Sequence, residues 1–229
     1  MVLPSRSSWL VGIALLAALT GGLLFFTPFP SDADTSPAPA SPDLAPAVAD
    51  TATFAGGCFW GMEPPYDKVN GVASTTSGFA GGEELDPSYR EVAMGKTSHT
   101  EVVQVVYDST KVSYERLLRI YWHNVDPFDG SGQFCDRGSQ YRPAIFAHSA
   151  RQQRLADQSK ETVAARFEQS IAVQIEPLNA FYPAETYHQN YYKKNPRDYK
   201  SYRTGCGRDA RLRDIWGDAA GSDASLAVK

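Results

Sequence analysis

The sequence predicts an α+β fold, a single two-layer α/β sandwich in which helices cover one ferredoxin-like mixed sheet. Two observations lead to this expectation. Segments with apolar residues on alternate or both faces recur between segments with helical spacing, in the order strand, helix, strand, strand, helix, strand, helix, strand, helix. Residues 51–216 are also dense in Tyr, Phe and Trp, which supply the apolar surface for one core.

Five segments are expected to form strands. Residues 100–108, TEVVQVVYD, carry valine on both faces, which indicates a strand at the centre of the sheet. In the last segment Ile171, Val173 and Ile175 alternate along the chain, the pattern of a half-buried strand. The expected strands are residues 51–56, 71–82, 100–108, 141–148 and 170–177.

Four segments are expected to form helices. The pair Pro64–Pro65 falls near the first turn of the first helix, where a missing N–H is tolerated. Ser113 can cap the second helix, and the fourth ends before Pro196. Residues 83–99 form a loop with room for one helical turn, and residues 126–140 form a Gly/Asp loop of a length that is uncommon unless functional. The expected helices are residues 58–69, 114–125, 149–169 and 184–195.

Residues 1–30 differ from the rest of the chain. Trp9–Phe26 contains no charged residue, and about 20 apolar residues suffice to span a bilayer as a helix. We expect an uncleaved signal anchor; a cleaved signal peptide and a misread start are the alternatives. Arg6 precedes the apolar run, which favours a cytoplasmic N-terminus. The folded domain is then expected in the cell envelope, on the periplasmic side.

Two further segments lack the composition of a folded core. Residues 31–50 are rich in Pro, Ala, Ser and Asp and are expected to form a linker. Residues 217–229 are small and polar and are expected to form a flexible tail. The formal net charge is −4 and no Lys/Arg run occurs, which argues against nucleic acid as a partner.

The three cysteines are Cys58, Cys135 and Cys206, and none belongs to a C-x-x-C pair. The four histidines follow no zinc-ligand spacing, so no metal site is expected. Cys58, in the stretch GGCFWG, stands where a strand passes into a helix. Such a position is expected to lower the pKa of a thiol. From this stretch alone, a core thiol, half of a disulfide and a nucleophile all remain open.

Motifs along the whole folded part resemble one known family. The chain is similar to peptide methionine sulfoxide reductase A over residues 51–216, through motifs that occur in this order: GGCFWGME, SGFAGG, PSYREV, HTEVVQVVYD, DRGSQYRPAIF and AETYHQNYY. The resemblance implies reduction of the S epimer of methionine sulfoxide in proteins, with the free amino acid as a further substrate left open. It implies the repair of oxidised proteins under oxidative stress.

The resemblance also implies the roles of individual residues. Cys58 matches the nucleophile, and Phe59 and Trp60 match the pocket for the S-methyl group. Glu101 matches the acid that protonates the sulfoxide oxygen. The remaining matches are the two hydroxyls that hydrogen-bond this oxygen and a residue that orients the substrate, which are Tyr89, Tyr141 and Asp136.

Chemistry makes these roles reasonable, although each residue has a plainer interpretation. Oxide is a poor leaving group, so thiolate attack at sulfur needs a buried acid that stays protonated near neutral pH. Glu101 opens a valine-rich strand, where burial is plausible. Without the resemblance, Glu101 would be read as an exposed strand end, Asp136 as a turn, and the two tyrosines as loop and core residues.

Cys206, flanked by Gly205 and Gly207, is expected to resolve a Cys58 sulfenic acid through a redox-active disulfide. A static Cys58–Cys206 disulfide is the alternative. Cys135 is given no role from the family; it is expected to be inert or a second partner for Cys58. His188, in TYHQNYY, is expected to satisfy a local hydrogen bond, with a place near the site as the alternative.

No bound cofactor is expected, and the reductant is expected to be an external thioredoxin-like dithiol. If the domain lies outside the inner membrane, this dithiol protein must be an exported one. The expected partners are oxidised proteins and peptides, and the protein is expected to be a monomer with a membrane tether. Two other functions remain open. They are a Cys/His hydrolase, for which no oriented His–Asn pair is evident, and a tethered binding module with structural thiols.

Overall fold

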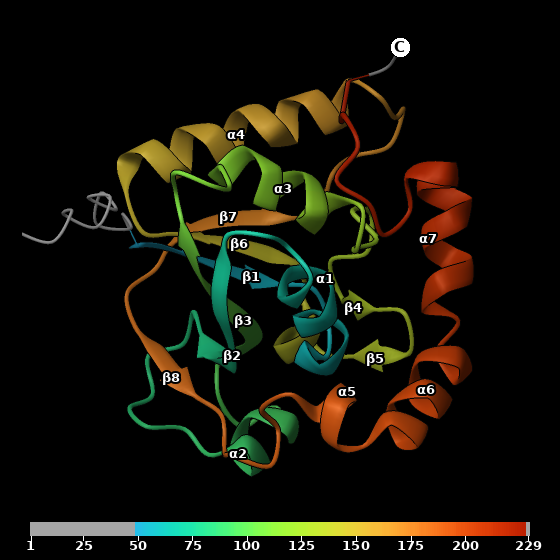
Figure 1. Ribbon diagram of the computed structural model, residues 1–229. Coiled ribbons are helices and arrows are strands. Elements are labelled where there is room, and N and C mark those ends of the chain that lie inside the picture. Colours follow the sequence, from blue (N-terminus) through green and yellow to red (C-terminus); the bar gives the residue numbers. More distant parts are fainter. Residues whose placement is uncertain (1–48, 228–229) are drawn as a thin grey trace, which may run out of the picture. The chain divides into compact units, whose positions relative to one another are not determined.

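The structure is a computed structural model that describes residues 49–227 (Figure 1). The expected signal segment, residues 1–30, and all but the last two residues of the expected linker lie outside the described residues. Between residues 49 and 227, no helix combines the length and the apolar composition needed to cross a membrane.

One six-stranded sheet organises the domain, with the order β7-β6-β1-β3-β2-β8. All its pairings are antiparallel except that of β6 with β7. Four strands in the order β6-β1-β3-β2 reproduce the split ferredoxin-like arrangement, with helix α1 (Glu63–Asp67) between β1 and β2 and helix α3 (Tyr114–Trp122) between β3 and β6. The predicted mixed sheet is thereby confirmed. The strands are β1 (Ala49–Ala55), β2 (Val72–Ala80), β3 (Thr100–Asp108), β6 (Ala144–Ala147), β7 (Gln174–Pro177) and β8 (Phe181–Pro183).

The predicted central strand is confirmed, since β3 lies between β1 and β2 and spans the predicted residues. The 126–140 loop contains a small separate hairpin of β4 (Gly132–Gln133) and β5 (Asp136–Arg137). A 3₁₀ turn, η2 (Ser139–Tyr141), follows it. The long loop is therefore locally ordered by its own backbone pairing.

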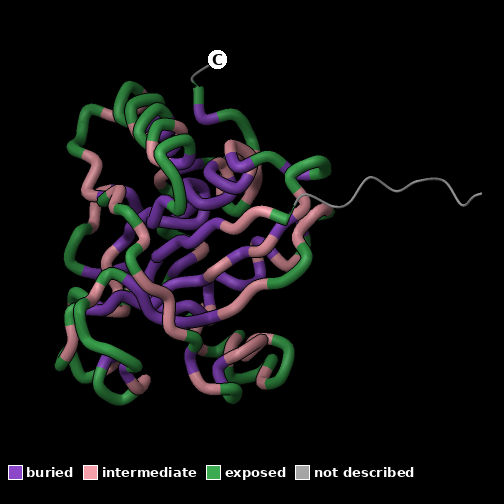
Figure 2. The backbone as a smooth tube through the Cα atoms, turned by 90° about the vertical axis from the view of Figure 1, so that its left-hand side faces the viewer, coloured by how far each residue is buried: buried purple, intermediate pink, exposed green. Residues whose placement is uncertain are grey.

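The helices pack mainly on one face of the sheet. In Figure 1, α3 and α4 lie together over the sheet, and Trp122 of α3 donates its indole N–H to Ser159 of α4. Figure 2 shows the buried residues concentrated along the strands and the helices that cover them. The helices are α1 (Glu63–Asp67), α2 (Tyr89–Ala93), α3 (Tyr114–Trp122), α4 (Ala150–Ala164), α5 (Tyr191–Lys194), α6 (Pro196–Gly205) and α7 (Arg208–Trp216).

An aromatic stack joins β1 to the first helices. The Phe54 ring lies 5.2 Å from Tyr66, 6.2 Å from Tyr114 and 5.4 Å from Tyr121, measured between centroids. The Tyr121 hydroxyl donates to the Ala55 carbonyl at 3.0 Å. The end of β1, which leads to Cys58, is therefore fixed both by its strand neighbours and from the helical layer.

Several predictions of secondary structure were wrong. The predicted helix over 184–195 is helical only from Tyr191, because Asn190 adopts a left-handed backbone (φ 55°). Before it, the Gln189 side chain exchanges hydrogen bonds with the backbone of Ser77 on β2. The helix predicted over 58–69 consists of a 3₁₀ turn and α1. Strand β8 and helices α6 and α7 were not predicted.

The domain also extends beyond its predicted ends. Asp50, assigned to the linker, pairs within β1 and accepts a hydrogen bond from the Tyr107 hydroxyl at 3.0 Å. The predicted flexible tail is wrong for residues 217–227. Leu226 is buried, and Asp223 forms an ion pair with Arg116 of α3. Apolar burial and this ion pair hold the segment against the helical layer.

Candidate active site

Cys58 is separated from the end of β1 by two glycines and lies at the start of the 3₁₀ turn η1 (Phe59–Gly61). Gly57 turns the chain there with φ 82°, and a Cβ on it would lie 2.6 Å from Cβ of Gln133. Glycine is required because both the backbone conformation and the close approach exclude a side chain. The turn closes with a hydrogen bond from the Gly61 N–H to the Cys58 carbonyl at 3.0 Å.

Glu101 lies beside Cys58, on the central strand β3, and is only 1% exposed. Its Oε2 accepts a hydrogen bond from the Phe59 N–H at 3.0 Å. Burial raises the pKa of Glu101 to about 8, and the Phe59 N–H and the Cys58 thiol offset part of this rise. The carboxyl is therefore protonated at neutral pH, the state that a general acid needs.

The expected lowering of the Cys58 pKa was wrong. Burial raises the pKa of this thiol well above its ordinary value, and the charges of Glu101 and Asp136 raise it further. Hydrogen bonds from the Trp60 N–H and the Tyr202 hydroxyl act in the opposite direction. A three-residue turn offers no helix dipole to outweigh burial, so the resting thiol is protonated.

Tyr89 and Tyr141 approach the pair of Cys58 and Glu101 from two different elements. Tyr89 begins α2, which is fixed by a Ser88–Glu91 capping box, and Tyr141 ends η2. Burial raises the pKa of each hydroxyl, and the charges of Glu101 and Cys58 contribute. Both hydroxyls are therefore neutral donors at physiological pH, as the sequence interpretation requires.

Asp136, on β5, is held by a residue that sequence reasoning missed. The Tyr202 hydroxyl, from α6, donates to Asp136 Oδ2 at 2.5 Å and also interacts with the Cys58 thiol. Burial raises the pKa of Tyr202, followed by the charges of Cys58 and Asp136. One feature of the sequence could have indicated Tyr202 as a site residue: it precedes Cys206 by one helical turn, in the stretch SYRTGC.

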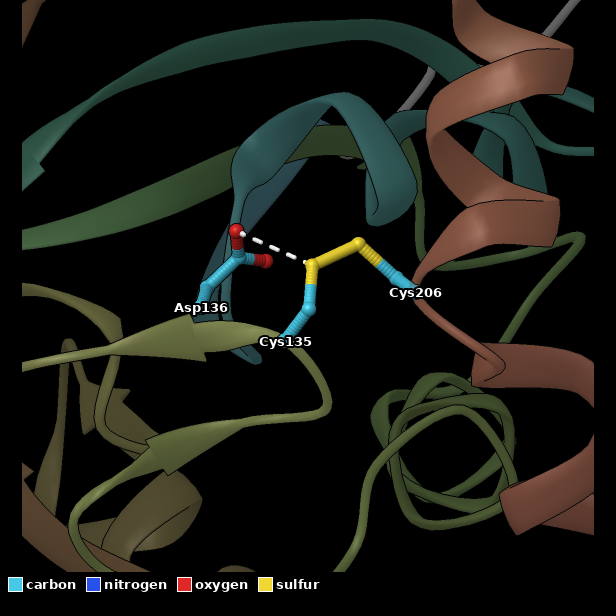
Figure 3. Close-up of side chains that lie close together, drawn as sticks. All are labelled: Cys135, Asp136 and Cys206. Carbon is cyan, nitrogen blue, oxygen red and sulfur yellow. Dashed lines mark hydrogen bonds between the residues drawn. A yellow bond between two sulfur atoms is a disulfide. The ribbon is translucent and has the colours of Figure 1, made fainter.

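Cys206 is bonded to Cys135 (Figure 3). Cys58 is the free cysteine. The expected Cys58–Cys206 bond is therefore not the one that the structure contains. The loop of the β4–β5 hairpin brings Cys135 to the end of α6, 71 residues away in the chain, with the two Cα atoms 4.9 Å apart. Cys135 is exposed, and its Sγ lies 3.7 Å from Asp136 Oδ1.

The same three side chains are the one group of possible metal ligands found among residues 49–227. Sulfur and carboxylate atoms of Cys135, Asp136 and Cys206 lie within 4.8 Å of one another. Thiolates, rather than disulfide sulfurs, bind metal ions. With its sulfurs bonded to each other, this group is a redox pair beside a carboxylate.

Phe59 and Trp60, the predicted pocket residues, follow Cys58 in the chain and differ in how far they are buried. Phe59 is buried against Phe79 and Tyr89, whereas Trp60 is half-buried and stacks on Tyr191 with 3.7 Å between ring centroids. The Trp60 indole N–H donates to Nδ1 of His188 at 3.1 Å. The aromatic surface next to Cys58 thus continues into the segment before α5.

His188 lies next to the site, which was the alternative left open by the sequence. Its ring centroid is 4.1 Å from that of Tyr89 and 5.0 Å from that of Phe59. Burial lowers the pKa of His188 to about 4, so the ring is neutral and accepts from Trp60. A surface hollow of about 480 Å³ between α1, α3 and the chain's C-terminal part includes none of these residues. Chemistry rather than cavity size therefore identifies the site.

Comparisons with known proteins agree with this chemistry. A family model described as peptide methionine sulfoxide reductase matches residues 50–220. Peptide methionine sulfoxide reductase MsrA of Bacillus licheniformis is 46% identical over 170 residues, which cover 73% of this chain and 94% of that protein. MsrA 2 of Caulobacter vibrioides is 48% identical over 178 residues, covering 77% and 90%.

Solved structures resemble the fold as well. The crystal structure of Mxr1 from Saccharomyces cerevisiae in reduced form matches with a TM-score of 0.63 and 36% identity, over 66% of this chain and 88% of Mxr1. Methionine sulfoxide reductase A of Corynebacterium diphtheriae matches with a TM-score of 0.60 and 36% identity, over 66% and 76%.

Proposed function

Because the chain belongs to the peptide methionine sulfoxide reductase family, we propose that it reduces the S epimer of methionine sulfoxide in proteins and peptides, with Cys58 as nucleophile and Glu101 as acid. One observation carries the assignment of roles. The free thiol of Cys58 is buried against a carboxyl that burial keeps protonated at neutral pH. Such a pair can both attack a sulfoxide and protonate its oxygen.

The first step transfers oxygen. The Cys58 sulfur attacks the sulfoxide sulfur while Glu101 gives its proton to the oxygen. The S–O bond of the substrate and the transient bond between the two sulfurs then break as the oxygen passes, as a hydroxyl, to the Cys58 sulfur. The proton lost by the thiol returns to Glu101, so the step converts thiol and sulfoxide into a Cys58 sulfenic acid and a thioether. The hydroxyls of Tyr89 and Tyr141 stabilise the developing charge on oxygen without adding charge of their own.

Substrate orientation falls to the neighbouring side chains. Trp60 presents a half-buried aromatic face beside Cys58 for the methyl group, and Phe59 supports it from within. Asp136 on β5, held by the Tyr202 hydroxyl, supplies a fixed hydrogen-bond acceptor. An apolar wall with a few fixed polar groups is the usual composition of a small-molecule site.

The second step makes and moves a disulfide. Cys206 condenses with the Cys58 sulfenic acid, releasing water and leaving a Cys58–Cys206 disulfide. The Cys135 thiolate then attacks Cys206 and releases Cys58 as a thiol after protonation. The product is the Cys135–Cys206 disulfide present in the structure. Support for the path comes from Tyr202, which precedes Cys206 by one helical turn and interacts with Cys58.

The last step regenerates the enzyme. An external thioredoxin-like dithiol reduces Cys135–Cys206 by two electrons, with no bound cofactor. Cys135 is exposed and Cys206 is half-buried, whereas Cys58 is 8% exposed. An external thiol can reach the first two sulfurs far more easily than the third, which supports Cys135–Cys206 as the disulfide that the partner reduces.

For its location, we propose that the N-terminal apolar segment anchors the domain on the periplasmic side of the cell envelope. Support comes from the uncharged run Trp9–Phe26 after Arg6 and from the Pro/Ala-rich residues that follow it. The N-terminal residue of the mature protein from membrane and soluble cell fractions tests this. An intact residue 1 in the membrane fraction is expected, and a shortened soluble protein would contradict the anchor.

Trapping tests the function. Reduced protein is mixed with an oxidised methionine peptide, without reductant, and both peptide and protein are analysed by mass spectrometry. About one equivalent of reduced peptide and one new Cys135–Cys206 disulfide are expected, and the Cys58→Ser variant should give neither. Cys58 acylation by an ester substrate, with the sulfoxide untouched, would instead indicate a hydrolase.

A further inference from the structure

Arg208, the first residue of α7, is a cation buried without a carboxylate. Only 1% of it is exposed, and none of the ion pairs between residues 49 and 227 includes it. Arg211, on the same helix, shows the ordinary arrangement, since it is half-exposed and pairs with Asp126 at 2.6 Å. A buried charge is costly unless it is paired, so Arg208 needs an explanation beyond packing.

The contacts of Arg208 use only part of its donor capacity. Nη2 donates to the carbonyls of Gly56 at 3.2 Å and Asn124 at 2.8 Å, and approaches Met62 Sδ at 3.1 Å. The guanidinium carbon lies 4.4 Å from the centroid of the Phe134 ring. Nε and Nη1 are buried and have no partner among the described residues. Two donor nitrogens of this buried guanidinium therefore have no hydrogen-bond acceptor among the described residues.

These contacts place Arg208 between the segments that carry all three cysteines. Gly56 and Met62 lie on either side of Cys58 in the chain, Phe134 directly precedes Cys135, and Arg208 itself follows Cys206 by two residues. Gly61 permits the approach, because a Cβ there would lie 2.6 Å from Arg208 Nη1. The guanidinium thus lies against the backbone of the turn that presents Cys58.

We infer that Arg208 is a positioning residue of the redox cycle, whose unpaired buried charge stabilises the Cys58 thiolate. The inference rests on the proposed function for the two moments at which Cys58 becomes negative, its attack on the sulfoxide and its displacement from Cys206. A leaving thiolate departs faster when its charge is stabilised. The charge of Arg208 stays in place in both steps. In the first step the Cys58 thiol gives up its proton as its sulfur attacks; in the second the Cys58–Cys206 bond breaks and the released thiolate takes up a proton.

Among the described residues, the other groups that act on the pKa of Cys58 include carboxylates and neutral donors but no cation. Glu101 on β3 and Asp136 on β5 oppose its ionisation, while the Tyr202 hydroxyl on α6 and the Trp60 N–H favour it. Tyr89 on α2 and Tyr141 on η2 interact with Cys58 but remain neutral. The groups that face Arg208 are Arg203, Tyr202, Tyr199 and Cys58.

The charge of Cys58 also acts on the pKa of Arg208. Burial lowers the pKa of Arg208 and the charge of Arg203 lowers it further, whereas the charges of Tyr202, Tyr199 and Cys58 raise it. Two of these last three groups belong to the proposed cycle. The guanidinium is thus close enough to feel the charge of Cys58, which agrees with the contacts to its turn.

The experiment measures the reactivity of Cys58 without any sulfoxide. In the full chain carrying Cys135→Ser and Cys206→Ser, the rate of Cys58 alkylation by iodoacetamide is followed by mass spectrometry across pH. Arg208→Met should slow alkylation below the thiol pKa about tenfold, a shift of about one pKa unit, as expected for loss of a nearby opposite charge. Arg208→Lys, which keeps the charge, should recover most of this rate. Arg211→Met is the matched control and should change nothing.

Each outcome decides. A folded Arg208→Met protein with an unchanged pH profile overturns the inference, and so does a shift that Arg208→Lys fails to reduce, because packing rather than charge would then be responsible. Where Arg208→Met does not fold by circular dichroism, Arg208→Lys decides alone. The Cys58 alkylation rate of Arg208→Lys must then stay within about threefold of that of the Cys135→Ser, Cys206→Ser protein, and a larger loss overturns the inference. Failure of sulfoxide reduction would not affect this readout, so the two proposals fail separately.

Discussion

The sheet and the C-terminal part of the chain contribute opposite halves of the site. Glu101 lies on β3 and Cys58 in the turn that follows β1, and both side chains are buried. Strands β1 and β3 pair over six residue pairs at the centre of the sheet. Cys135 lies in the turn between the two-residue strands β4 and β5. Cys206 lies at the end of α6, a helix with no buried residue. In Figure 1, α6 and α7 run along the side of the domain where the β4–β5 hairpin lies.

This difference matches two different chemical demands. Oxygen transfer needs a protonated carboxyl, and burial in a rigid sheet keeps Glu101 protonated. Electron delivery needs a disulfide that another protein can reach, and exposed loops supply it. Tyr202 connects the halves, because it extends from α6 to Asp136 and Cys58. The comparison predicts that substitutions in the two halves will affect different steps.

The largest effect is expected from Glu101→Gln, in the buried half. Loss of a general acid should slow the first turnover by about 10²–10⁴-fold. Because the pKa of Glu101 is raised to about 8, its acid form is present below that pH and lost above it. The wild-type first-turnover rate should therefore fall as pH rises through about 8, and the variant should lack this step. Rapid-quench measurement of peptide reduction checks both.

Binding provides the control for Glu101→Gln, since the amide keeps the shape of the carboxyl. The affinity for an oxidised methionine peptide, measured by calorimetry in a Cys58→Ser background, should change little. A Glu101→Gln protein that reduces its first equivalent at the wild-type rate would remove the acid role from the sheet half.

The next largest effect is expected from Cys206→Ser, in the exposed half. The first turnover should survive, giving one equivalent of reduced peptide. Steady-state turnover with a thioredoxin-like protein should fall roughly tenfold or more, because no disulfide forms at an accessible place. Cys135→Ser should instead accumulate a Cys58–Cys206 disulfide, which peptide mapping detects.

A small dithiol such as dithiothreitol separates recycling from chemistry. It should restore turnover to Cys206→Ser by reducing the sulfenic acid directly. Wild-type turnover of Cys135→Ser with the protein reductant would show that Cys58–Cys206 is itself the disulfide that the partner reduces, and would take Cys135 out of the path.

The sequence predicted the sheet half better than the C-terminal half, and for a physical reason. The strand over 100–108 was recognisable because valine on both of its faces reports burial along the strand itself, and the one over 71–82 because glycines mark its end. Helix α6 buries no residue, so it leaves no apolar period to detect. In the predicted helix over 184–195, Gln189 replaces local pairing with bonds to Ser77 on β2, a contact 112 residues away that no local pattern contains.

The same reason explains which residues of the site could be predicted from the sequence and which could not. Cys58, Glu101 and Tyr89 could be named because they lie within ordered motifs, and the structure brings them together. The Cys135–Cys206 bond and the contact of Tyr202 with Asp136 join segments 71 and 66 residues apart. The pKa of Cys58 was mispredicted because burial and two carboxylates, rather than the local turn, set it. Local sequence does not contain these long-range effects.

The smallest effect is expected from Tyr202→Phe, which tests the connection between the halves. One hydrogen bond contributes about 1 kcal/mol, which corresponds to about fivefold in rate. Because the hydroxyl serves both Cys58 and Asp136, the first turnover and the protein-supported turnover should each fall by about this factor. Tyr199→Phe, on the same helix, removes a hydroxyl that accepts from Arg203 at 3.1 Å and is the matched control. A loss confined to recycling would place Tyr202 in the exposed half alone, whereas equal losses in both rates would show that α6 also tunes the buried thiol.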